Sequence, residues 1–184
     1  MMKRTLTAVL ALTALSLGIW TLRPEPVDAQ RANRPAVYIT QATVPRNMEV
    51  SALVNFGRSH AARRLNETTG VPLNERMWNA KLIINFGRAL GDVQYDVLYY
   101  DVTQRRTLIT TQEIFVNDRT QQAFVNPVRL RRPQFSPGQK LEIVVTLRHR
   151  EVASTRTELS GEVPQNSGDG GLHAGRRSSL RPCT

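Results

Sequence analysis

The 184-residue chain contains one cysteine, Cys183, which is the penultimate residue. A single thiol cannot form an intramolecular disulfide, so the fold must be stabilised by an apolar core. A domain of about 130 residues buries roughly two-thirds of its unfolded surface, which is enough to fold without disulfides or a metal. Stabilisation by an internal disulfide is therefore excluded. Cys183 is predicted to be a free thiol on a chain end, and the alternative in a secreted protein is an intermolecular disulfide.

Histidine is also scarce, because only His60, His149 and His173 are present. A nucleophilic triad needs a serine, threonine or cysteine beside a histidine that a carboxylate holds, and no Gly-x-Ser-x-Gly motif provides that context. A zinc site needs three or four ligands at short spacings, which these histidines lack. No glycine-rich phosphate loop occurs. We therefore predict no catalytic residue, metal ligand or cofactor, and the enzyme alternative is a small cell-envelope hydrolase that uses His60 or His149.

Lysine is the third scarce residue. Of the 25 Lys and Arg residues only Lys3, Lys81 and Lys140 are lysines, which leaves 22 arginines in a chain of formal net charge +10. Arginine presents a planar fork of donors that matches phosphate and carboxylate groups, although GC-rich codon usage produces the same bias. A basic balance favours polyanionic partners and indicates nothing about the fold.

Residues 1–29 have the composition of an export signal. Lys3 and Arg4 precede an uncharged apolar stretch at residues 5–22, and Val27 and Ala29 are small residues at the −3 and −1 positions of a cleavage site before Gln30. The alternative is an uncleaved N-terminal anchor, because the apolar stretch approaches the length that spans a bilayer. The sequence therefore predicts a periplasmic or secreted protein with no membrane span after cleavage.

The clearest strand pattern lies at residues 141–147. Leu141, Ile143 and Val145 alternate with polar side chains on the other face, as in a half-buried strand. Similar alternation or β-branched and aromatic enrichment predicts further strands at residues 36–44, 78–87, 93–102, 107–116, 123–130 and 152–163. The last of these is polar enough to be an edge strand. Residues 164–184 show no periodicity and are predicted to be disordered.

The spacing of the apolar residues changes from that of a strand to that of a helix at residues 47–66. Val50, Leu53, Val54 and Leu65 recur at helical spacing, and Asn47 is available as the N-cap. An alternating strand at residues 49–56 is the alternative. We favour one helix inserted after the first strand, within a β domain that spans residues 30–163.

Residues 135–145, which read F-S-P-G-Q-K-L-E-I-V-V, resemble the loop and sixth strand of fibronectin type III and related immunoglobulin-like domains. Phe135 takes the usual leucine position and Leu141 replaces the tyrosine of the tyrosine corner, so the corner hydrogen bond cannot form. Residues 82–86 and 95–101 resemble the second and third strands. The resemblance implies an antiparallel immunoglobulin-like β-sandwich of about seven strands, a fold that hosts many unrelated functions.

This topology would gather cations at one end of the sandwich. The exit of the third strand and the loop into the sixth strand share a pole, where five cations are expected: Arg105, Arg106, Arg131, Arg132 and Lys140. They form a candidate anion-binding site for an acidic glycan, a lipid head group or an acidic protein face. Nucleic acid is disfavoured because no aromatic residues are interleaved with these arginines. The alternative is a set of solvated loop charges that maintain solubility.

The sequence therefore predicts an exported, non-enzymatic β-sandwich that acts as a binding or assembly module of the cell envelope.

Overall fold

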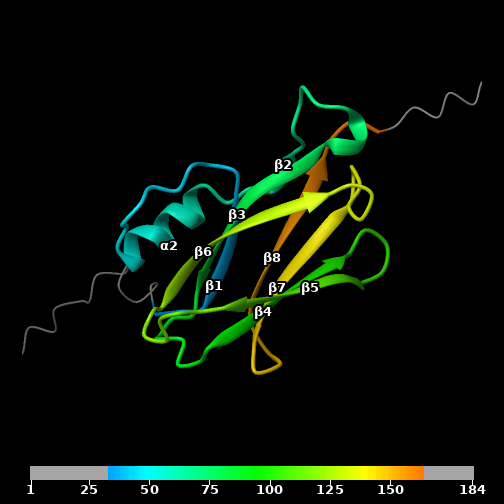
Figure 1. The fold of residues 1–184 in the computed structure, drawn as a ribbon. Coiled ribbons are helices and arrows are strands. Elements are labelled where there is room, and N and C mark those ends of the chain that lie inside the picture. The colour runs from blue at the N-terminus through cyan, green and yellow to red at the C-terminus, as the bar shows by residue number, and fades with distance from the viewer. Residues whose placement is uncertain (1–32, 164–184) are drawn as a thin grey trace, which may run out of the picture.

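The computed structural model describes residues 33–163, which form two packed β-sheets and one α-helix (Figure 1). The predicted signal segment at residues 1–29 and the predicted tail at residues 164–184 lie outside the described residues, as do Cys183 and His173. The export signal and the disordered tail therefore stay predictions.

The strands divide into a three-stranded and a five-stranded sheet. The smaller sheet has the order β1-β3-β6, and the larger has the order β2-β8-β7-β4-β5. All pairs are antiparallel except β2 with β8, which is parallel. The bounds are β1 Ala36–Thr40, β2 Arg64–Asn66, β3 Met77–Asn85, β4 Gln94–Asp101, β5 Thr107–Phe115, β6 Ala123–Arg131, β7 Lys140–Leu147 and β8 Arg150–Ser160.

The core lies between the sheets and follows the alternation of the strands. Leu141, Ile143 and Val145 of β7 are fully buried and belong to one cluster with Leu82 and Ile84 of β3. Side chains alternate faces at period 2, so these residues of each strand point into the space between the sheets. The predicted buried face of residues 141–147 is confirmed.

Figure 1 shows the two sheets as layers, with β3 and β6 in front of β7 and β8. In sandwich notation, β1, β3 and β6 correspond to strands A, B and E, and β8, β7, β4 and β5 correspond to G, F, C and C′. The strand order is that of an immunoglobulin-like β-sandwich, so the predicted fold class is confirmed. β7 occupies the sixth-strand position, with β2 as an additional short strand beside β8.

The loop before β7 closes the core at one end. Phe135 is buried and its ring meets that of Tyr99 edge-on, with 6.3 Å between the centroids. Leu141, which stands at the sequence position of the corner tyrosine, is fully buried. At the same end, Trp78 donates from Nε1 to the carbonyl of Ser160 across 2.8 Å, which ties β3 to the end of β8.

The helix α2 spans Val50–Ser59 and is shorter than the predicted residues 47–66. It begins later because Asn47 has a φ of 57°, outside the helical region, and Glu49 becomes the N-cap. It ends earlier because Leu65, the last helical-period residue, is buried in β2, where it pairs with Leu159 of β8. A buried leucine supports a helix and a strand equally well, and here the parallel pairing determines its conformation.

α2 packs on the outer face of the three-stranded sheet and contacts β1 and β3. Leu53 of the helix joins Ile83 and Ala123 in a second, smaller cluster. Gly57 faces β1 at very close range, because a Cβ added there would lie 2.7 Å from Cδ2 of Tyr38 and 3.3 Å from its Cβ. The glycine that weakens the helical pattern is therefore the residue that allows the helix to approach the sheet.

Gly57→Ala is expected to destabilise the protein by about 1–2 kcal/mol, because Tyr38 must move to admit the methyl group. In a free helix the same change would stabilise by about 1 kcal/mol, so the sign of the effect reports the close approach. Urea denaturation followed by circular dichroism measures it. Ser51→Ala in the same helix is the control, and Tyr38→Ala should relieve the penalty in a double-mutant cycle.

β8 agrees in part with the sequence-based expectation of an edge strand, since its residues 150–157 pair only with β7, whereas its last three residues lie between β7 and β2. Its residues 158–160 pair with β2, a strand that the sequence pattern did not indicate. At the opposite side of the larger sheet, β5 is an edge strand along its whole length.

Candidate functional site

The loops at one end of the sandwich bring the predicted cations together in part. This end, which we call the basic pole, is formed by the β4–β5 and β6–β7 loops with the chain on either side of β2. The loops are joined by hydrogen bonds from Lys140 N to Thr103 Oγ1 (2.9 Å) and from Val102 N to the Lys140 carbonyl (2.8 Å). Among residues 33–163, carboxylates engage two of the five predicted cations, Arg106 and Arg132.

Arg132 is a structural residue. Its guanidinium donates to both oxygens of Glu67, from Nε at 2.5 Å and from Nη2 at 2.9 Å, and the two side chains are only 9% and 4% exposed. Arg132 also donates to the carbonyl of Glu162 (2.6 Å), and Glu67 accepts from the Glu162 amide (3.3 Å). Through these contacts Arg132 connects the β6–β7 loop to the chain around β2 and to the end of β8. Its donors are therefore not free to bind a partner.

Arg106 shares a carboxylate with Arg156 of β8. Its Nε donates to Oε2 of Glu142 (2.6 Å), Arg156 donates to Oε1 from Nε (3.0 Å) and Nη2 (2.8 Å), and the Arg106 guanidinium lies 3.8 Å from the ring centroid of Tyr100. The hydrogen bond from Arg106, followed by that from Arg156, holds the pKa of Glu142 below its ordinary value despite burial. One carboxylate therefore orients two guanidinium groups side by side and leaves an excess positive charge.

These two arginines line a groove of about 480 Å³ with two further cations, Arg63 and Lys140. We call this the basic groove and define it by Arg63, Arg106, Lys140 and Arg156. Glu158 also lines it and is paired with Arg64 at 3.3 Å. Among residues 33–163, neither Arg63 nor Lys140 forms an ion pair, so the groove is lined by four cations and by one carboxylate that is already engaged.

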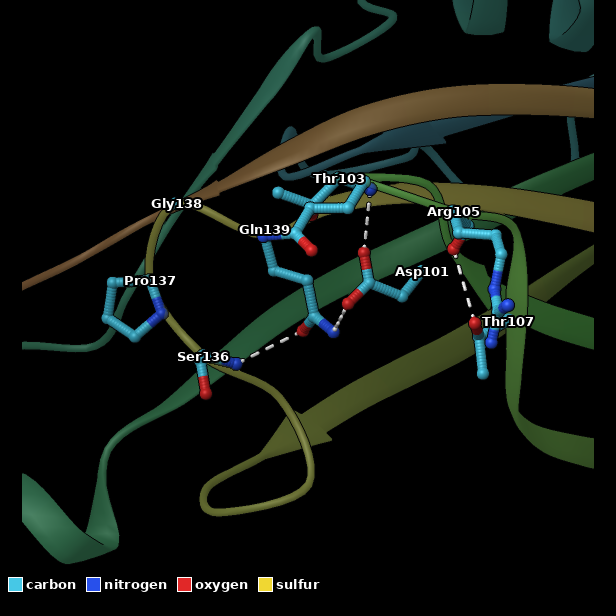
Figure 2. Close-up of a pocket in the computed structure, with 9 residues that line it drawn as sticks. Asp101, Thr103, Arg105, Thr107, Ser136, Pro137, Gly138 and Gln139 are labelled. Atoms are coloured by element: carbon cyan, nitrogen blue, oxygen red, sulfur yellow. Dashed lines mark hydrogen bonds between the residues drawn. The ribbon is translucent and has the colours of Figure 1, made fainter.

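Arg105 lies beside the basic groove, at the rim of a polar hollow of about 770 Å³ (Figure 2). Figure 2 shows the Gln139 side chain bridging this hollow, where it donates to Asp101 Oδ2 (2.8 Å) and accepts from the Ser136 amide (3.2 Å). Burial raises the pKa of Asp101, but hydrogen bonds from Thr103 and Gln139 outweigh it and leave the pKa below its ordinary value. Asp101 is thus an ionised acceptor that fixes the loop, and the Arg105 side chain remains exposed.

Arg131 is at the same end but on the other sheet. It is the last residue of β6, pairs across the ladder with Met77 and is exposed. Of the predicted site residues, Arg105, Arg106 and Lys140 are therefore gathered on the side of the five-stranded sheet. Arg131 lies on the three-stranded sheet, and Arg132 is held in the ion pair with Glu67.

Sequence reasoning missed Arg63 and Arg156. Arg156 enters the site because β7 and β8 form a hairpin whose register places it opposite Glu142. The turn residues are Arg148 and His149, both with positive φ (50° and 62°). Tight turns of this kind normally carry Asn-Gly, so the sequence held no signal for the hairpin register. Arg63 is placed by β2, where its carbonyl accepts from the Glu158 amide (2.9 Å).

Neither of the two described histidines lines the basic groove. His60 stacks on Phe56 with 4.1 Å between ring centroids, and its Nδ1 lies 2.9 Å from Ser59 Oγ and 3.1 Å from the Phe56 carbonyl. His149 is exposed in the β7–β8 turn. Within residues 33–163 neither ring contacts a carboxylate, which is the third group that the hydrolase alternative requires.

Two other features are absent from the part of the chain that the structure describes. Residues 33–163 contain no group of three or more His, Cys, Asp or Glu side chains arranged to hold a metal ion. No helix within the same residues has the length and apolar character to cross a membrane.

The shared carboxylate predicts a pH effect. Because the pKa of Glu142 is lowered from 4.5, its contacts stabilise the fold above about pH 4.5, and that contribution is lost as the pH falls through the lowered pKa. Glu142→Gln should cost about 1 kcal/mol near pH 7, since both guanidinium groups are largely exposed, and nothing at strongly acidic pH. Urea denaturation of both proteins between pH 3 and pH 7 measures the difference, which a constant gap across that range would contradict.

Comparison with known proteins gave structural likenesses only. No protein-family model and no curated protein sequence matches the chain. An immunoglobulin-like protein from Pseudomonas aeruginosa is 12% identical, with a TM-score of 0.36 over 68% of this chain and 90% of that one. A putative beta-galactosidase from Bacteroides fragilis is 14% identical (TM-score 0.36, 55% of this chain). A glycosyl hydrolase family 2 member from Bacteroides cellulosilyticus is 11% identical (TM-score 0.33, 52% of this chain).

The chain spans only 16% and 15% of the lengths of those two hydrolases. At these levels of similarity the fold assignment rests on the strand order and pairing described above. Residues 33–163 form an immunoglobulin-like β-sandwich.

Proposed function

We propose that this protein is an exported binding module that holds an anionic partner in the basic groove. The observation that carries the proposal is the grouping of Arg63, Arg106, Lys140 and Arg156 around one groove, with Arg105 at its side. Three of these, Arg63, Arg105 and Lys140, form no ion pair among residues 33–163, so binding an anion there displaces no protein carboxylate.

The geometry of the groove favours an anion that carries several charges. The Glu142 carboxylate accepts hydrogen bonds from both Arg106 and Arg156. The remaining donors of these two guanidinium groups are therefore oriented before a ligand binds. A pre-ordered guanidinium loses less conformational entropy on binding than a free side chain does. Phosphate, sulfate and carboxylate groups on a glycan, a lipid head group or an acidic protein face share this chemistry.

Export is supported by the basic start, the apolar stretch and the small residues before Gln30. Expression of the full chain in a Gram-negative host followed by N-terminal sequencing of the periplasmic protein should give Gln30 as the first residue. An intact N-terminus at Met1 in the membrane fraction would instead support the anchor.

Charge removal tests the binding site. A variant with Arg63→Ser, Arg105→Ser and Lys140→Ser should elute from a heparin column at clearly lower salt than the wild type, because three contacts to the polyanion are lost. The matched control is Arg34→Ser, Arg88→Ser and Arg119→Ser, which removes the same charge from the loops at the opposite end of the sandwich. Equal shifts for the two variants would show a net-charge effect and would overturn the proposed groove.

A vesicle assay separates the sources of anion. Retention on phosphatidylglycerol vesicles together with weak heparin binding would identify a lipid surface, and the reverse would identify a sulfated or phosphorylated glycan.

A further inference from the structure

β5 is the edge of the five-stranded sheet, and it differs from the other edges in being unprotected. It is nine residues long, with the sequence T-L-I-T-T-Q-E-I-F, and Glu113 is its one charged residue. Leu108 is 49% exposed and Phe115 is 69% exposed. A long edge strand with β-branched residues, few charges and no proline is a ready template for pairing with another chain.

The other described edges are blocked or carry several charges. Residues 150–157 of β8, which β2 does not cover, include the charged residues Arg150, Glu151 and Arg156. At β2, the side-chain amide of Gln41 donates to the carbonyl of Asn66 and accepts from its amide, both at 2.8 Å, and so occupies the groups that a further strand would use. β6 carries Pro127 and two arginines along its length, which are the features that natural edge strands use against pairing. The five-residue β1 has its Ile39 carbonyl occupied by the amide of Ala62 (2.7 Å).

The free side of β5 presents backbone groups in a regular row. The Val116 amide donates to the Val93 carbonyl (2.8 Å), and the register pairs Phe115 with Gln94 and Glu113 with Asp96. Because hydrogen-bonded and non-hydrogen-bonded pairs alternate in an antiparallel ladder, the amides and carbonyls of Glu113 and Phe115 point away from β4. The same holds for Thr111, so three residues offer donors and acceptors to a further strand.

The charges at the two ends of β5 favour a second copy of the same strand as its pairing partner. Arg105 and Arg106 precede the strand and give its start two positive charges, whereas Glu113, Asp118 and Arg119 lie within and after its second half and give its end a net charge of −1. An antiparallel copy of the same strand brings the basic start of one chain beside the acidic end of the other at both ends, whereas a parallel copy would place like charges together. Self-pairing around a two-fold axis is therefore electrostatically complementary.

We propose that two copies of this chain pair through β5 in antiparallel orientation, with Gln112 facing Gln112 of the second copy across the two-fold axis. In this register Glu113 lies opposite Thr111, so the two Glu113 carboxylates do not face each other. The outward amides of Thr111 and Glu113 then form the inter-chain hydrogen bonds, and Ile109 lies opposite the exposed Phe115. The two five-stranded sheets become one continuous ten-stranded sheet.

Cysteine cross-linking tests the register. In a full chain carrying Cys183→Ser, Gln112→Cys should form a disulfide-linked dimer under mild oxidation, because residues opposite each other in a non-hydrogen-bonded pair have the spacing that a disulfide needs. Arg129→Cys, exposed on the β6 edge, is the control and should stay largely monomeric. Cross-linking of both variants to the same extent, or of neither, would overturn the proposal.

Sedimentation velocity tests the association without a covalent link. The wild-type chain should show concentration-dependent dimers. Glu113→Pro should weaken the dimer by about tenfold or more, because it removes an outward amide from each copy and leaves the β4 ladder intact. If that variant unfolds, Gln112→Lys places two like charges opposite each other and should have the same effect. A wild-type chain that is monomeric at all concentrations, or a dimer that neither variant weakens, would contradict the β5 interface.

Discussion

Glu67→Ala is expected to destabilise the protein by about 3–5 kcal/mol, because it leaves the Arg132 guanidinium buried without its counter-charge. Both side chains are almost fully buried, and among residues 33–163 Arg132 forms no ion pair with any other carboxylate. The carbonyl of Glu162, which also accepts from Arg132, cannot neutralise the charge. Chemical denaturation at neutral pH gives the difference directly.

Glu158→Ala is the matched control for that experiment. Glu158 also pairs with an arginine, but the Arg64 and Glu158 side chains are 62% and 36% exposed. An exposed ion pair contributes about 0–1 kcal/mol, so this variant should retain nearly all of the wild-type stability. If both variants lost the same free energy, Glu67 and Arg132 would have to be solvated, contrary to their burial.

Trp78→Ala is expected to cost about 3–5 kcal/mol, which is the range for removing a large aromatic side chain from a core. Trp78 is 0% exposed, and its indole Nε1 donates to the Ser160 carbonyl. Loss of the side chain removes packing between the sheets and the link to the end of β8 together. Urea denaturation followed by circular dichroism measures the effect.

Trp78→Phe separates the two contributions, because phenylalanine keeps most of the apolar volume and cannot donate to Ser160. Its cost should lie near 1–2 kcal/mol, the sum of a small cavity and an unsatisfied carbonyl. A loss for Trp78→Ala of less than about 1 kcal/mol would contradict the packing of β3 against the larger sheet.

The strands were predictable because their signal is local. The alternation of Leu141, Ile143 and Val145 depends only on which face of the strand is buried, and the structure buries those three residues. The predicted strand at residues 107–116 likewise differs from β5 by one residue. Period-2 patterns are robust because a slip of one residue would expose the whole apolar set.

The helix bounds were less predictable because the same residues satisfy two patterns. Leu65 fits the helical period of residues 47–66 and is buried in β2. The tetrapeptide N-F-G-R shows how strongly context decides: residues 55–58 lie in α2, whereas Asn85 ends β3 and Gly87 has a φ of 74°. Four identical residues thus adopt two conformations, since tertiary contacts override local propensity.

The site was predictable only as far as the topology was. Placing Arg105, Arg106 and Lys140 at one end required no more than the order of the strands. The engagement of Arg132 by Glu67, 65 residues away in sequence, and of Arg106 by Glu142 depends on side-chain packing that no sequence spacing encodes. Arg63 and Arg156 enter the groove through β2 and through the hairpin turn at Arg148 and His149, neither of which has a recognisable turn or strand signal.

The central claim is that Arg63, Arg105 and Lys140 contact an anionic partner directly. The most direct measurement is the salt dependence of the affinity for a heparin oligosaccharide, for the wild type and the triple serine variant. Each lost contact should reduce the slope of log affinity against log salt by about 0.7–0.9, so the variant's slope should be smaller by about 2–3. An unchanged slope, or the same reduction for the control at the opposite end of the sandwich, would contradict the account.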